Sequence, residues 1–466
     1  MPFKRFSEED LTFLKTILDA DQISTGESNL NLHSADQAYH KGYLPDVIVW
    51  PRSTDDVAAV MKMAYDRMIP VTPWGAGTSL EGNCVAVHGG IIMDFQQMDR
   101  IIKVREKDFQ VDVQPGVTHN RLNKEIGRCG LFFPPDPGAD ATIGGMVANN
   151  ASGIRTIKYG ATRDNVLRLS AVLPNGEIIQ AGSCATKSSS GYDLVRLFTG
   201  SEGTLAVITR ITLKLAGIPE HFSAGVAPFD SVDAAAEAVY DIMSYGITPA
   251  ALELLDAKAI GYINRDGRIH LDEKTTLFIE FTGSNADSLA EDIAVAEELC
   301  ASHGCEAFRS GVGIKERNGL WQARHHFGES LIRCNPGKDV LLMDTAVPLS
   351  QFPAMVAFAT CTADEAGLEN CVSAHAGDGN LHLNIIGDMQ DGDFVDRLNQ
   401  AYEKIVSFAI SVGGTATGEH GVGIGKRKFM AQEHGRGLDV MQRIKQLLDP
   451  KGILNPGKIF PDSGFL

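Results

Sequence analysis

Three histidines and one glutamate lie in two glycine-flanked stretches of the C-terminal half. Residues 373–384 are S-A-H-A-G-D-G-N-L-H-L-N, with His375 and His382 on either side of a G-D-G-N turn. The second stretch, G-E-H-G, places Glu419 beside His420. Two imidazoles that face one another across a hairpin, together with a carboxylate, are a common ligand set for a divalent metal ion that keeps positions open for substrate. A lone histidine is usually a surface or core residue, but three in two such motifs favour a site.

A glycine-rich stretch near the N-terminus has the composition of an anion-binding loop. Residues 72–83 are T-P-W-G-A-G-T-S-L-E-G-N. Glycine allows positive φ and close approach of the backbone, so successive N–H groups can converge on a phosphate. We expect a diphosphate site here, and the alternative is a tight glycine loop without a ligand. Two standard nucleotide motifs are excluded. The dinucleotide motif G-x-G-x-x-G would need a glycine where this chain has Leu80. The P-loop motif G-x-x-x-x-G-K-[ST] would need a serine or threonine after Gly425-Lys426, where this chain has Arg427.

A second glycine-rich stretch covers residues 132–153, F-F-P-P-D-P-G-A-D-A-T-I-G-G-M-V-A-N-N-A-S-G. It has almost no large polar side chains, so it can lie flat against a large partner and bind it through backbone and amide groups. An aromatic cofactor ring is the expected partner, and the alternative is a long connecting loop. A further glycine pair enters a strand at G-S-E-G-T, residues 200–204, where a plain turn is as good an interpretation as a cofactor contact.

Composition and charge exclude some classes of protein. A net charge of −17 argues against binding to nucleic acid, which requires basic stripes. The eight cysteines are scattered without a C-x-x-C pair, and no signal peptide begins the chain, so we expect reduced thiols and a cytoplasmic location. No apolar run approaches the ~18 residues of a spanning helix, so we expect no membrane span. Peripheral contact with a membrane stays open.

The pattern of elements predicts an α+β protein with several parts. A β-α-β start that turns into strand-rich sequence predicts one lobe over 45–217 rather than a doubly wound parallel sheet. Over 218–425, helices alternate with short strands, which predicts an antiparallel sheet with helices on one face. A helical segment, 1–44, precedes these lobes, and a C-terminal segment with one helix, 426–466, follows them. In the second lobe we expect helices at 231–245, 286–302, 314–333, 350–366 and 393–412, and strands at 250–255, 275–282, 305–309, 340–347, 371–375 and 381–387.

Several segments together resemble the FAD-binding domain of the vanillyl-alcohol-oxidase-type flavoproteins. They are P-D-V-I-V-W-P (45–51), P-W-G-A-G-T-S (73–79), the stretch 137–153, Y-G (159–160) and G-S-E-G-T-L (200–205). The resemblance extends to L-N-P-G-K (454–458), which implies a C-terminal segment that packs back on the FAD domain. Members that hold FAD covalently often carry a histidine in the diphosphate loop, where this chain has Thr78, so we expect dissociable FAD. The implied FAD contacts are Pro73, Gly75, Ala76, Gly77, Thr78, Ser79, Asn83, Gly116, Pro135, Asp140, Thr142, Gly144, Gly145, Asn149, Ser152, Gly153, Tyr159, Glu202, Gly203, Ile208 and Asn455.

The motifs H-A-G-D-G-N-L-H and G-E-H-G-V-G resemble the D-2-hydroxyacid dehydrogenase branch of that family. This branch holds D-lactate dehydrogenases, the glycolate oxidase flavin subunit and D-2-hydroxyglutarate dehydrogenases. The resemblance implies that His375, His382 and Glu419 bind Zn²⁺ or Mn²⁺. It also implies that His420 is the general base and that Asn384 contacts substrate.

The family's W-x-x-R motif is matched by Trp321-Gln322-Ala323-Arg324. By resemblance, Arg324 clamps the substrate carboxylate, and the alternative is a surface arginine on helix 314–333. The hydroxyglutarate branch carries a threonine four residues after this arginine and a lysine before a later aspartate. This chain has Gly328 and 342–344, L-M-D, at those positions. We therefore expect lactate, glycolate or a short apolar 2-hydroxy acid, unless Arg309, Arg317 or Arg333 supplies the second clamp for D-2-hydroxyglutarate.

The sequence thus predicts an FAD- and metal-dependent dehydrogenase of a D-2-hydroxy acid. The rival hypotheses are a metal-dependent hydrolase without redox chemistry, a non-catalytic flavoprotein subunit and a flavin-dependent carbon–oxygen transferase. The expected partners are a small 2-hydroxy acid and an electron acceptor, which is a quinone, a cytochrome or an electron-transferring flavoprotein. A homodimer is one expected assembly.

Overall fold

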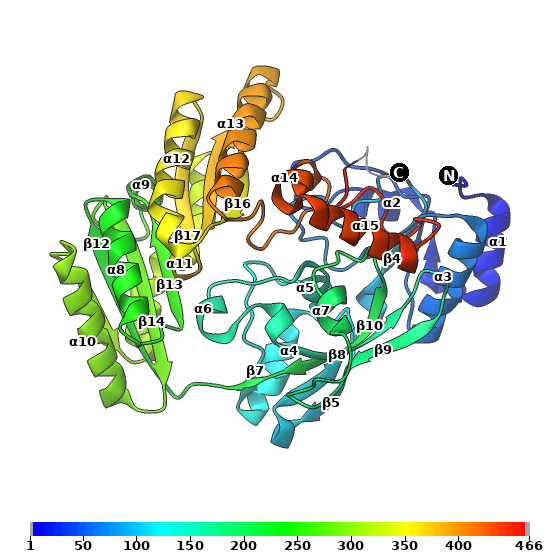
Figure 1. Cartoon of the computed structure of the whole chain (residues 1–466), viewed down its shortest axis with the longest axis horizontal. Helices are drawn as coiled ribbons and strands as arrows, with labels where there is room; N and C mark the ends of the chain where they lie inside the picture. The colour runs from blue at the N-terminus through cyan, green and yellow to red at the C-terminus, as the bar shows by residue number, and fades with distance from the viewer. Residues whose placement is uncertain (1–2, 462–466) are drawn as a thin grey trace. The chain divides into compact units, whose positions relative to one another are not determined.

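The computed structural model describes residues 3–461 (Figure 1). The ends of the predicted terminal segments, 1–2 and 462–466, lie outside the described residues. The chain divides into two compact units, of which the second comprises Ile154–Tyr159 and Pro219–Gly418 and the first comprises the rest. The sequence predicts boundaries after residues 217 and 425. In the structure the later boundary lies after Gly418, and the short segment 154–159 belongs to the second unit.

The first unit contains two main sheets and a short two-stranded one. In the first sheet, with strand order β1-β2-β4-β3, the strands β2, β4 and β3 are parallel and β1 is antiparallel. The second sheet is antiparallel, with order β5-β6-β10-β8-β9. The strands are β1 (Ile23–Ser24), β2 (Val47–Val49), β3 (Val71–Trp74), β4 (Ile91–Asp94), β5 (Ile101–Arg105), β6 (Gln110–Val113), β7 (Leu131–Phe132), β8 (Val166–Val172), β9 (Ile178–Gly182), β10 (Val207–Lys214) and β11 (Ala216–Gly217).

Helix α3 (Thr54–Arg67) shows how local sequence sets these elements. Its N-cap Ser53 accepts a hydrogen bond from the backbone N–H of Asp56, and Met68 ends the helix in a left-handed conformation. Its buried side chains pack into one core with β2, β3 and β4. The other helices of this unit are α1 (Glu8–Ile17), α2 (Glu27–Leu32), α4 (His119–Ile126), α5 (Ile143–Asn149), α7 (Leu194–Phe198), α14 (Met430–His434) and α15 (Arg436–Leu448).

The C-terminal segment is tied to the first unit through backbone and buried charge. The N–H of Val71 in β3 donates to the carbonyl of Ile453, and the N–H of Asn455 donates to the carbonyl of Val71. On α15 the buried ammonium of Lys445 lies 2.5 Å from Asp449 Oδ2 and 2.8 Å from the carbonyl oxygen of Thr204. Burial lowers the pKa of Lys445. These contacts explain why a segment so late in the chain belongs to this unit.

The second unit is built on one seven-stranded sheet, in which every pairing is antiparallel. Its strand order is β15-β12-β14-β13-β17-β18-β16, so β17 and β18 form a hairpin flanked by β13 on one side and β16 on the other. The strands are β12 (His221–Phe229), β13 (Ala251–Leu255), β14 (Thr275–Gly283), β15 (Arg309–Val312), β16 (Asp339–Ala346), β17 (Glu369–His375) and β18 (Asn380–Gly387).

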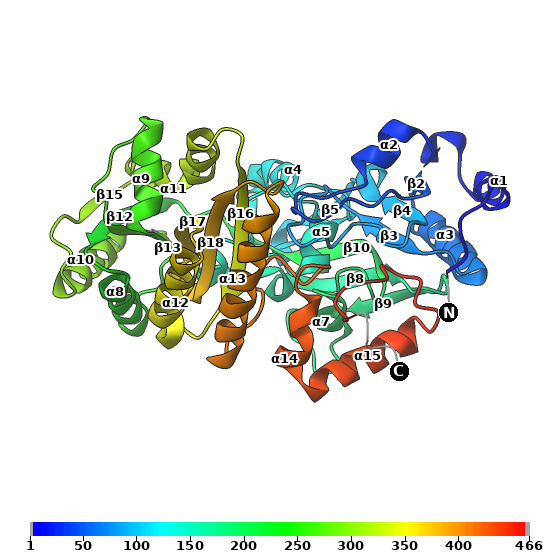
Figure 2. The ribbon, with the colours of Figure 1, turned by 90° about the horizontal axis from the view of Figure 1, so that it is seen from above.

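Helices cover both faces of this sheet, so the expectation of helices on one face is wrong. Ala224 and Val226 of β12 pack in a core with α9 and α11. Gly225 between them faces the opposite way, where an added Cβ would lie 3.1 Å from Ile293 of α10. Figure 2 shows α9 and α11 on one side of the sheet and α8, α10 and α12 on the other. The helices are α6 (Thr156–Tyr159), α8 (Val232–Ser244), α9 (Ala257–Asp266), α10 (Ala286–Ser302), α11 (Ile314–Cys334), α12 (Phe352–Glu365) and α13 (Gly392–Ser411).

Four elements of the second unit differ from the sequence prediction. Strand β12 and helices α6 and α9 were not expected, and the strand expected at 305–309 begins only at Arg309. The other predicted helices and strands of this lobe are confirmed to within a few residues. Within the described residues, no helix has both the length and the apolar character needed to cross a membrane.

Replacing Lys445 with methionine should destabilise the first unit, because it removes the cation beside the buried carboxylate of Asp449. Breaking a buried ion pair from one side typically costs about 3–5 kcal/mol. For a domain of this size the melting temperature falls by roughly 2–4 °C for each kcal/mol. Thermal unfolding of the variant measures the loss.

The matched control is Lys62→Met, since Lys62 and Asp66 form the same i,i+4 pair on α3 with both side chains exposed. Exposed pairs of this kind contribute at most about 0.5 kcal/mol. Equal melting temperatures for the two variants would contradict a structural role for the buried pair.

Candidate active site

The glycine loop after β3 lies directly against the start of α5. A Cβ added at Gly75 would lie 2.4 Å from Oγ1 of Thr142, so no side chain fits between the two segments. Thr142 is the N-cap of α5 and accepts a hydrogen bond from the N–H of Gly145 at 3.2 Å. Gly77 and Gly82 have φ of +69° and +73°, a region that favours glycine. Two backbone segments that are far apart in the sequence thus lie in close contact.

A third segment and the C-terminus complete this arrangement. The amide of Asn455 donates to the carbonyl oxygens of Asn83 at 2.9 Å and Glu202 at 2.7 Å. The buried carboxylate of Glu202 accepts hydrogen bonds from the N–H groups of Val422 and Gly423. Burial raises the pKa of Glu202, and these donors oppose the rise. The loops predicted to contact FAD are therefore joined into one assembly.

All but one of the predicted FAD contacts belong to the first unit. Tyr159 is the exception, because α6 belongs to the second unit, where Lys158 donates to Thr282. Several of the glycines lie at close backbone crossings. An added Cβ would lie 2.0 Å from the carbonyl oxygen of Phe95 at Gly116, 2.6 Å from Pro115 at Gly144 and 2.1 Å from the carbonyl oxygen of Asp136 at Gly153. The remaining predicted contacts are Pro73, Ala76, Thr78, Ser79, Pro135, Asp140, Asn149, Ser152, Gly203 and Ile208.

The stretch 132–153 contacts the G-E-H-G motif within the first unit. Oγ of Ser152 donates to Oε2 of Glu419 at 3.0 Å, and Nδ2 of Asn149 donates to the carbonyl oxygen of His420 at 3.5 Å. Two motifs that are far apart in the sequence are thus hydrogen-bonded to one another. The stretch also contains α5, a helix that the sequence analysis does not predict.

The two histidines of the second unit lie on one face of the β17–β18 hairpin. Ser373 pairs with His382 and His375 pairs with Asn380, so the two imidazoles are diagonal neighbours rather than directly opposite. Their ring centroids are 5.1 Å apart with an interplanar angle of 86°. Both side chains are buried, at 7% and 5% exposure. The two imidazoles therefore lie next to one another, offset by one diagonal step of the hairpin.

Glu253, on the central strand β13, is a site residue that the sequence does not reveal. Its Oε1 lies 2.7 Å from Nδ1 of His375, and its Oε2 accepts Nε and Nη2 of Arg324 at 3.0 and 2.7 Å. Burial acts to raise its pKa, but the charges and hydrogen bonds of His375 and Arg324 prevail and lower it. The one available signal is a lone acid in the apolar run L-E-L-L, because a fully buried glutamate requires a partner.

Asp344, on the edge strand β16, anchors the chain just before Glu419. Its buried carboxylate accepts Oγ1 of Thr417 and the N–H of Gly418, each at 2.8 Å, and Nδ2 of Asn380 at 2.7 Å. Nδ1 of His382, which pairs with Asp344 across the strands, is 3.9 Å away. A Cβ at Gly418 would lie 2.2 Å from the Asn380 amide, so only glycine fits there. Asp344 thus fixes the backbone that leads into Glu419 relative to the hairpin.

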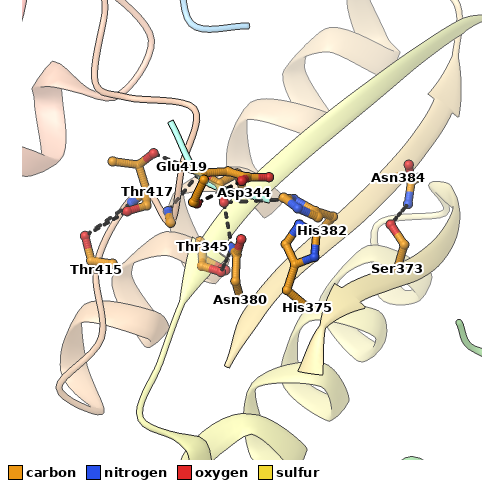
Figure 3. A network of polar contacts seen from close by, with 12 residues as sticks. Asp344, Thr345, Ser373, His375, Asn380, His382, Asn384, Thr415, Thr417 and Glu419 are labelled. Carbon is orange, nitrogen blue, oxygen red and sulfur yellow. Dashed lines mark hydrogen bonds and ion pairs between the residues drawn. The ribbon is translucent and has the colours of Figure 1, made fainter. Parts of the chain in front are cut away.

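The three predicted metal ligands come together (Figure 3). His375, His382 and Glu419 each offer one ligand atom, and these atoms all lie within 4.8 Å of one another. Imidazole nitrogen and carboxylate oxygen suit Zn²⁺ and Mn²⁺. The donor set and its spacing fit a divalent ion.

Arg324 lies on α11 and is bound to Glu253, so it is not the exposed surface arginine of the alternative. Of the three other arginines, Arg309 is exposed on β15, Arg333 is mostly exposed and lies 3.7 Å from Asp266, and Arg317 is bound to Glu280. None of the three is bound to a residue of the hairpin site by the described ion pairs.

Asn384 lies on the same face of β18 as His382, two residues further along. Its Nδ2 donates to the carbonyl oxygen of Cys371 at 3.3 Å and to Oγ of Ser373 at 3.2 Å. Figure 3 shows Asn384 and Ser373 set apart from the group around Asp344 and His382. The amide nitrogen is thus used within the hairpin, and Asn384 as a substrate contact stays a prediction.

Comparison with known proteins gives the class to which this architecture belongs. Residues 45–182 match the model of an FAD binding domain, and residues 218–459 match that of the C-terminal domain of FAD linked oxidases. The chain is 36% identical to a probable mitochondrial D-lactate dehydrogenase of Danio rerio, over 97% of this chain and 92% of the relative. It is also 36% identical to the glycolate oxidase subunit GlcD of Bacillus subtilis, over 90% of this chain and 89% of the relative.

Among solved structures, p-cresol methylhydroxylase with bound substrate is similar in fold, with a TM-score of 0.80 at 15% identity, over 100% of this chain and 99% of the other. The chain belongs to the FAD-linked oxidase family, in the vanillyl-alcohol-oxidase superfamily branch that includes D-lactate dehydrogenases and glycolate oxidase flavin subunits. It is an FAD-dependent oxidoreductase, as the sequence predicts, and the predicted fold class is confirmed.

The residues of the first unit fit FAD as a bound group. The glycine loop can approach Thr142 this closely only because Gly75 has no Cβ. Replacing Gly75 with alanine should therefore push the glycine loop away from α5 and weaken FAD binding by an order of magnitude or more. Titration of the apoprotein with FAD, followed by flavin fluorescence, measures the dissociation constant.

Gly217→Ala is the control, since a Cβ at this position in the same unit would have no neighbour within 4 Å. It should bind FAD as the wild type does. Unchanged affinity in the Gly75 variant would contradict the predicted site.

Proposed function

We propose that the enzyme oxidises a D-2-hydroxy acid to the 2-oxo acid with FAD and a divalent metal ion. The substrate is D-lactate-like, glycolate or another short apolar 2-hydroxy acid, and the electrons pass to a separate acceptor. The names of the relatives, D-lactate dehydrogenase and glycolate oxidase subunit, support this substrate class.

One hydrogen bond carries the proposal. Ser152 belongs to the stretch predicted to lie along the flavin, and it donates to Glu419, which is a member of the candidate metal set. His420, the predicted base, follows Glu419 directly and is bound through its carbonyl to Asn149 of the same stretch. The residues predicted for flavin, metal and base are thus linked within a few hydrogen bonds, which supports one reaction that uses all three.

His375, His382 and Glu419 would hold Zn²⁺ or Mn²⁺. When bound, the ion supplies a Lewis acid that lowers the pKa of the substrate hydroxyl, and FAD supplies the acceptor for the hydride. The protein's own share is to fix the ligands before substrate arrives. Glu253 and Asp344 do so through buried hydrogen bonds to the hairpin and to Gly418.

Arg324 and His420 act on the substrate itself. Arg324 has a planar guanidinium, a group that binds a carboxylate through two parallel hydrogen bonds. Glu253 accepts hydrogen bonds from Nε and Nη2 of Arg324, and Nη1 takes no part in these contacts. The imidazole of His420 accepts the proton of the hydroxyl as the bond to hydrogen at Cα breaks. This base is nine-tenths buried, so bulk water does not compete for the proton.

The residues at the two positions that differ from the hydroxyglutarate branch favour a monocarboxylate. Gly328 on α11 has no neighbour within 4 Å of an added Cβ, and Leu342 lies directly opposite Asn384 on the adjacent strand. Neither position offers a hydrogen-bond donor for a second carboxylate. The acceptor, which is a quinone, a cytochrome or an electron-transferring flavoprotein, stays a prediction, as do a homodimer and a cytoplasmic location.

Anaerobic mixing with D-lactate should bleach the oxidised flavin band, and prior treatment with a chelator should abolish the bleaching. Adding back Zn²⁺ or Mn²⁺ should restore it, because the substrate hydroxyl needs the ion to lose its proton. A panel of D- and L-2-hydroxy acids, including glycolate and D-2-hydroxyglutarate, then ranks the substrates by reduction rate.

Chemical reduction by dithionite is the control, since it bleaches the flavin without the metal. Full-rate reduction of chelated enzyme by D-lactate would contradict the metal's role. A yellow protein that no hydroxy acid bleaches would favour the rivals, either a non-catalytic flavoprotein subunit or a carbon–oxygen transferase.

Replacing His420 with glutamine should lower kcat by roughly 10²–10⁴-fold, because the variant has no base at that position. FAD content and metal content should stay at the wild-type level, since neither FAD nor the metal is predicted to be bound by His420. His270→Gln, at an exposed position, is the control for loss of a histidine as such. Wild-type turnover in the His420 variant would contradict the assignment of His420 as the general base.

A further inference from the structure

We infer that Glu253 is a positioning residue that sets the metal ligand His375 and the carboxylate clamp Arg324 with one carboxylate. This inference rests on the proposed function, because it takes His375 as a metal ligand and Arg324 as the group that binds the substrate carboxylate. Glu253 itself would touch neither metal nor substrate. It concerns only residues of the second unit.

Both oxygens of Glu253 are used, and they are used differently. Oε1 is 2.7 Å from Nδ1 of His375, whereas Oε2 accepts two N–H groups of Arg324 at 3.0 and 2.7 Å. The carboxylate itself is 1% exposed, on a strand at the middle of the sheet. The position of the carboxylate is therefore fixed by the sheet. Its hydrogen bonds in turn fix the side chains of His375 and Arg324, which come from other elements.

The contact with His375 decides which ring nitrogen can bind a metal. A carboxylate accepts but does not donate, so Nδ1 of His375 must carry the hydrogen. In the neutral imidazole, the lone pair is then on Nε2, which becomes the ligand atom. An anionic acceptor on the far side of the ring also makes the imidazole a stronger ligand, as in the carboxylate–histidine–metal arrangements of many metal sites.

The contact with Arg324 limits how that arginine can turn. With Nε and Nη2 held by Oε2, the guanidinium plane is fixed, and the edge that carries Nη1 stays available to a substrate. The distance between clamp and metal ligand is then set through a single carboxylate. A substrate that places its hydroxyl on the metal and its carboxylate on the clamp must match that distance.

A second glutamate–arginine pair, with its arginine on the same helix and its glutamate on the neighbouring strand, gives a comparison. Glu280 of β14 is 1% exposed and accepts Nε of Arg317, which lies on α11 seven residues before Arg324. Its strand neighbour across the ladder is Ala251, two residues before Glu253, so both glutamates face α11. Trp321, which lies between the two arginines along the helix, is fully buried, and the guanidinium of Arg317 lies 5.1 Å from its ring centroid. The two pairs share burial, partner type and helix, but only Glu253 also contacts a histidine.

This comparison separates positioning from stability. If Glu253 served only to neutralise a buried arginine, Glu253→Gln and Glu280→Gln would have the same consequences. If it orients His375, only the first variant should affect the metal.

The experiment compares both variants with the wild type as FAD-loaded enzymes. Zn²⁺ and Mn²⁺ affinity is measured by competition with a chelator of known affinity, and melting temperature is measured alongside. We expect Glu253→Gln to weaken metal binding about 10–100-fold, the usual effect of losing a carboxylate behind a metal-bound histidine. Glu280→Gln should stay within about twofold of the wild type. At saturating metal, Glu253→Gln should raise KM more than it lowers kcat, because Arg324 loses its fixed plane.

Wild-type metal affinity in Glu253→Gln would overturn the inference, and so would an equal loss in Glu280→Gln. A wild-type enzyme that binds no divalent ion would instead overturn the proposed function, and the positioning role with it, so the two failures are told apart.

If Glu253→Gln does not fold, the tautomer of His375 in the wild type decides. The enzyme is labelled with ¹⁵N-histidine, and His375 is assigned by its loss in His375→Asn. A hydrogen on Nδ1 supports the inference, and a hydrogen on Nε2 overturns it.

Discussion

The arrangement of the second unit depends on two carboxylates buried in one sheet. Glu253 and Asp344 are 1% and 0% exposed, and an unpaired buried carboxylate costs several kcal/mol. Each is compensated by donors from separate elements. These are α11 and β17 for Glu253, and β18, the Thr417 hydroxyl and the Gly418 N–H for Asp344. The energetic need to satisfy these anions therefore fixes the hairpin histidines and the approach to Glu419 at the same time.

In the first unit, close contacts between backbone segments depend on glycines, which have no side chain, rather than on buried charged side chains. At Gly75, Gly116 and Gly153 an added Cβ would lie within 2.4 Å of another atom, so these positions accept only glycine without rearrangement. Where backbones come this close, no side chain lies between them, so a ligand can approach the backbone itself. A diphosphate needs many donors and little added charge, and an acidic chain can supply such donors without an arginine cluster.

Local chemistry made much of this structure predictable. Helix α3 follows from Ser53 and its apolar spacing, and the hairpin of His375 and His382 follows from G-D-G-N. Helix α5 was missed because I-G-G-M-V-A-N is a poor helix former, and its stability comes from the Thr142 cap and packing on Pro115. Strand β12 was missed because it contains a glycine and a proline, and it is held by two neighbouring strands. Glu253 lies 122 residues from His375, so only the sheet order reveals their contact.

The path of the chain explains how two distant stretches of the first unit come together. The chain first leaves the first unit after Gly153, and it makes its last return to that unit at Glu419. Ser152 and Glu419, which flank these two passages, are hydrogen-bonded to one another. Gly418, the last residue of the second unit, is held by Asp344 beside the hairpin histidines. One peptide bond joins Gly418 to Glu419, so the segment that Asp344 holds runs directly into the residue that Ser152 contacts.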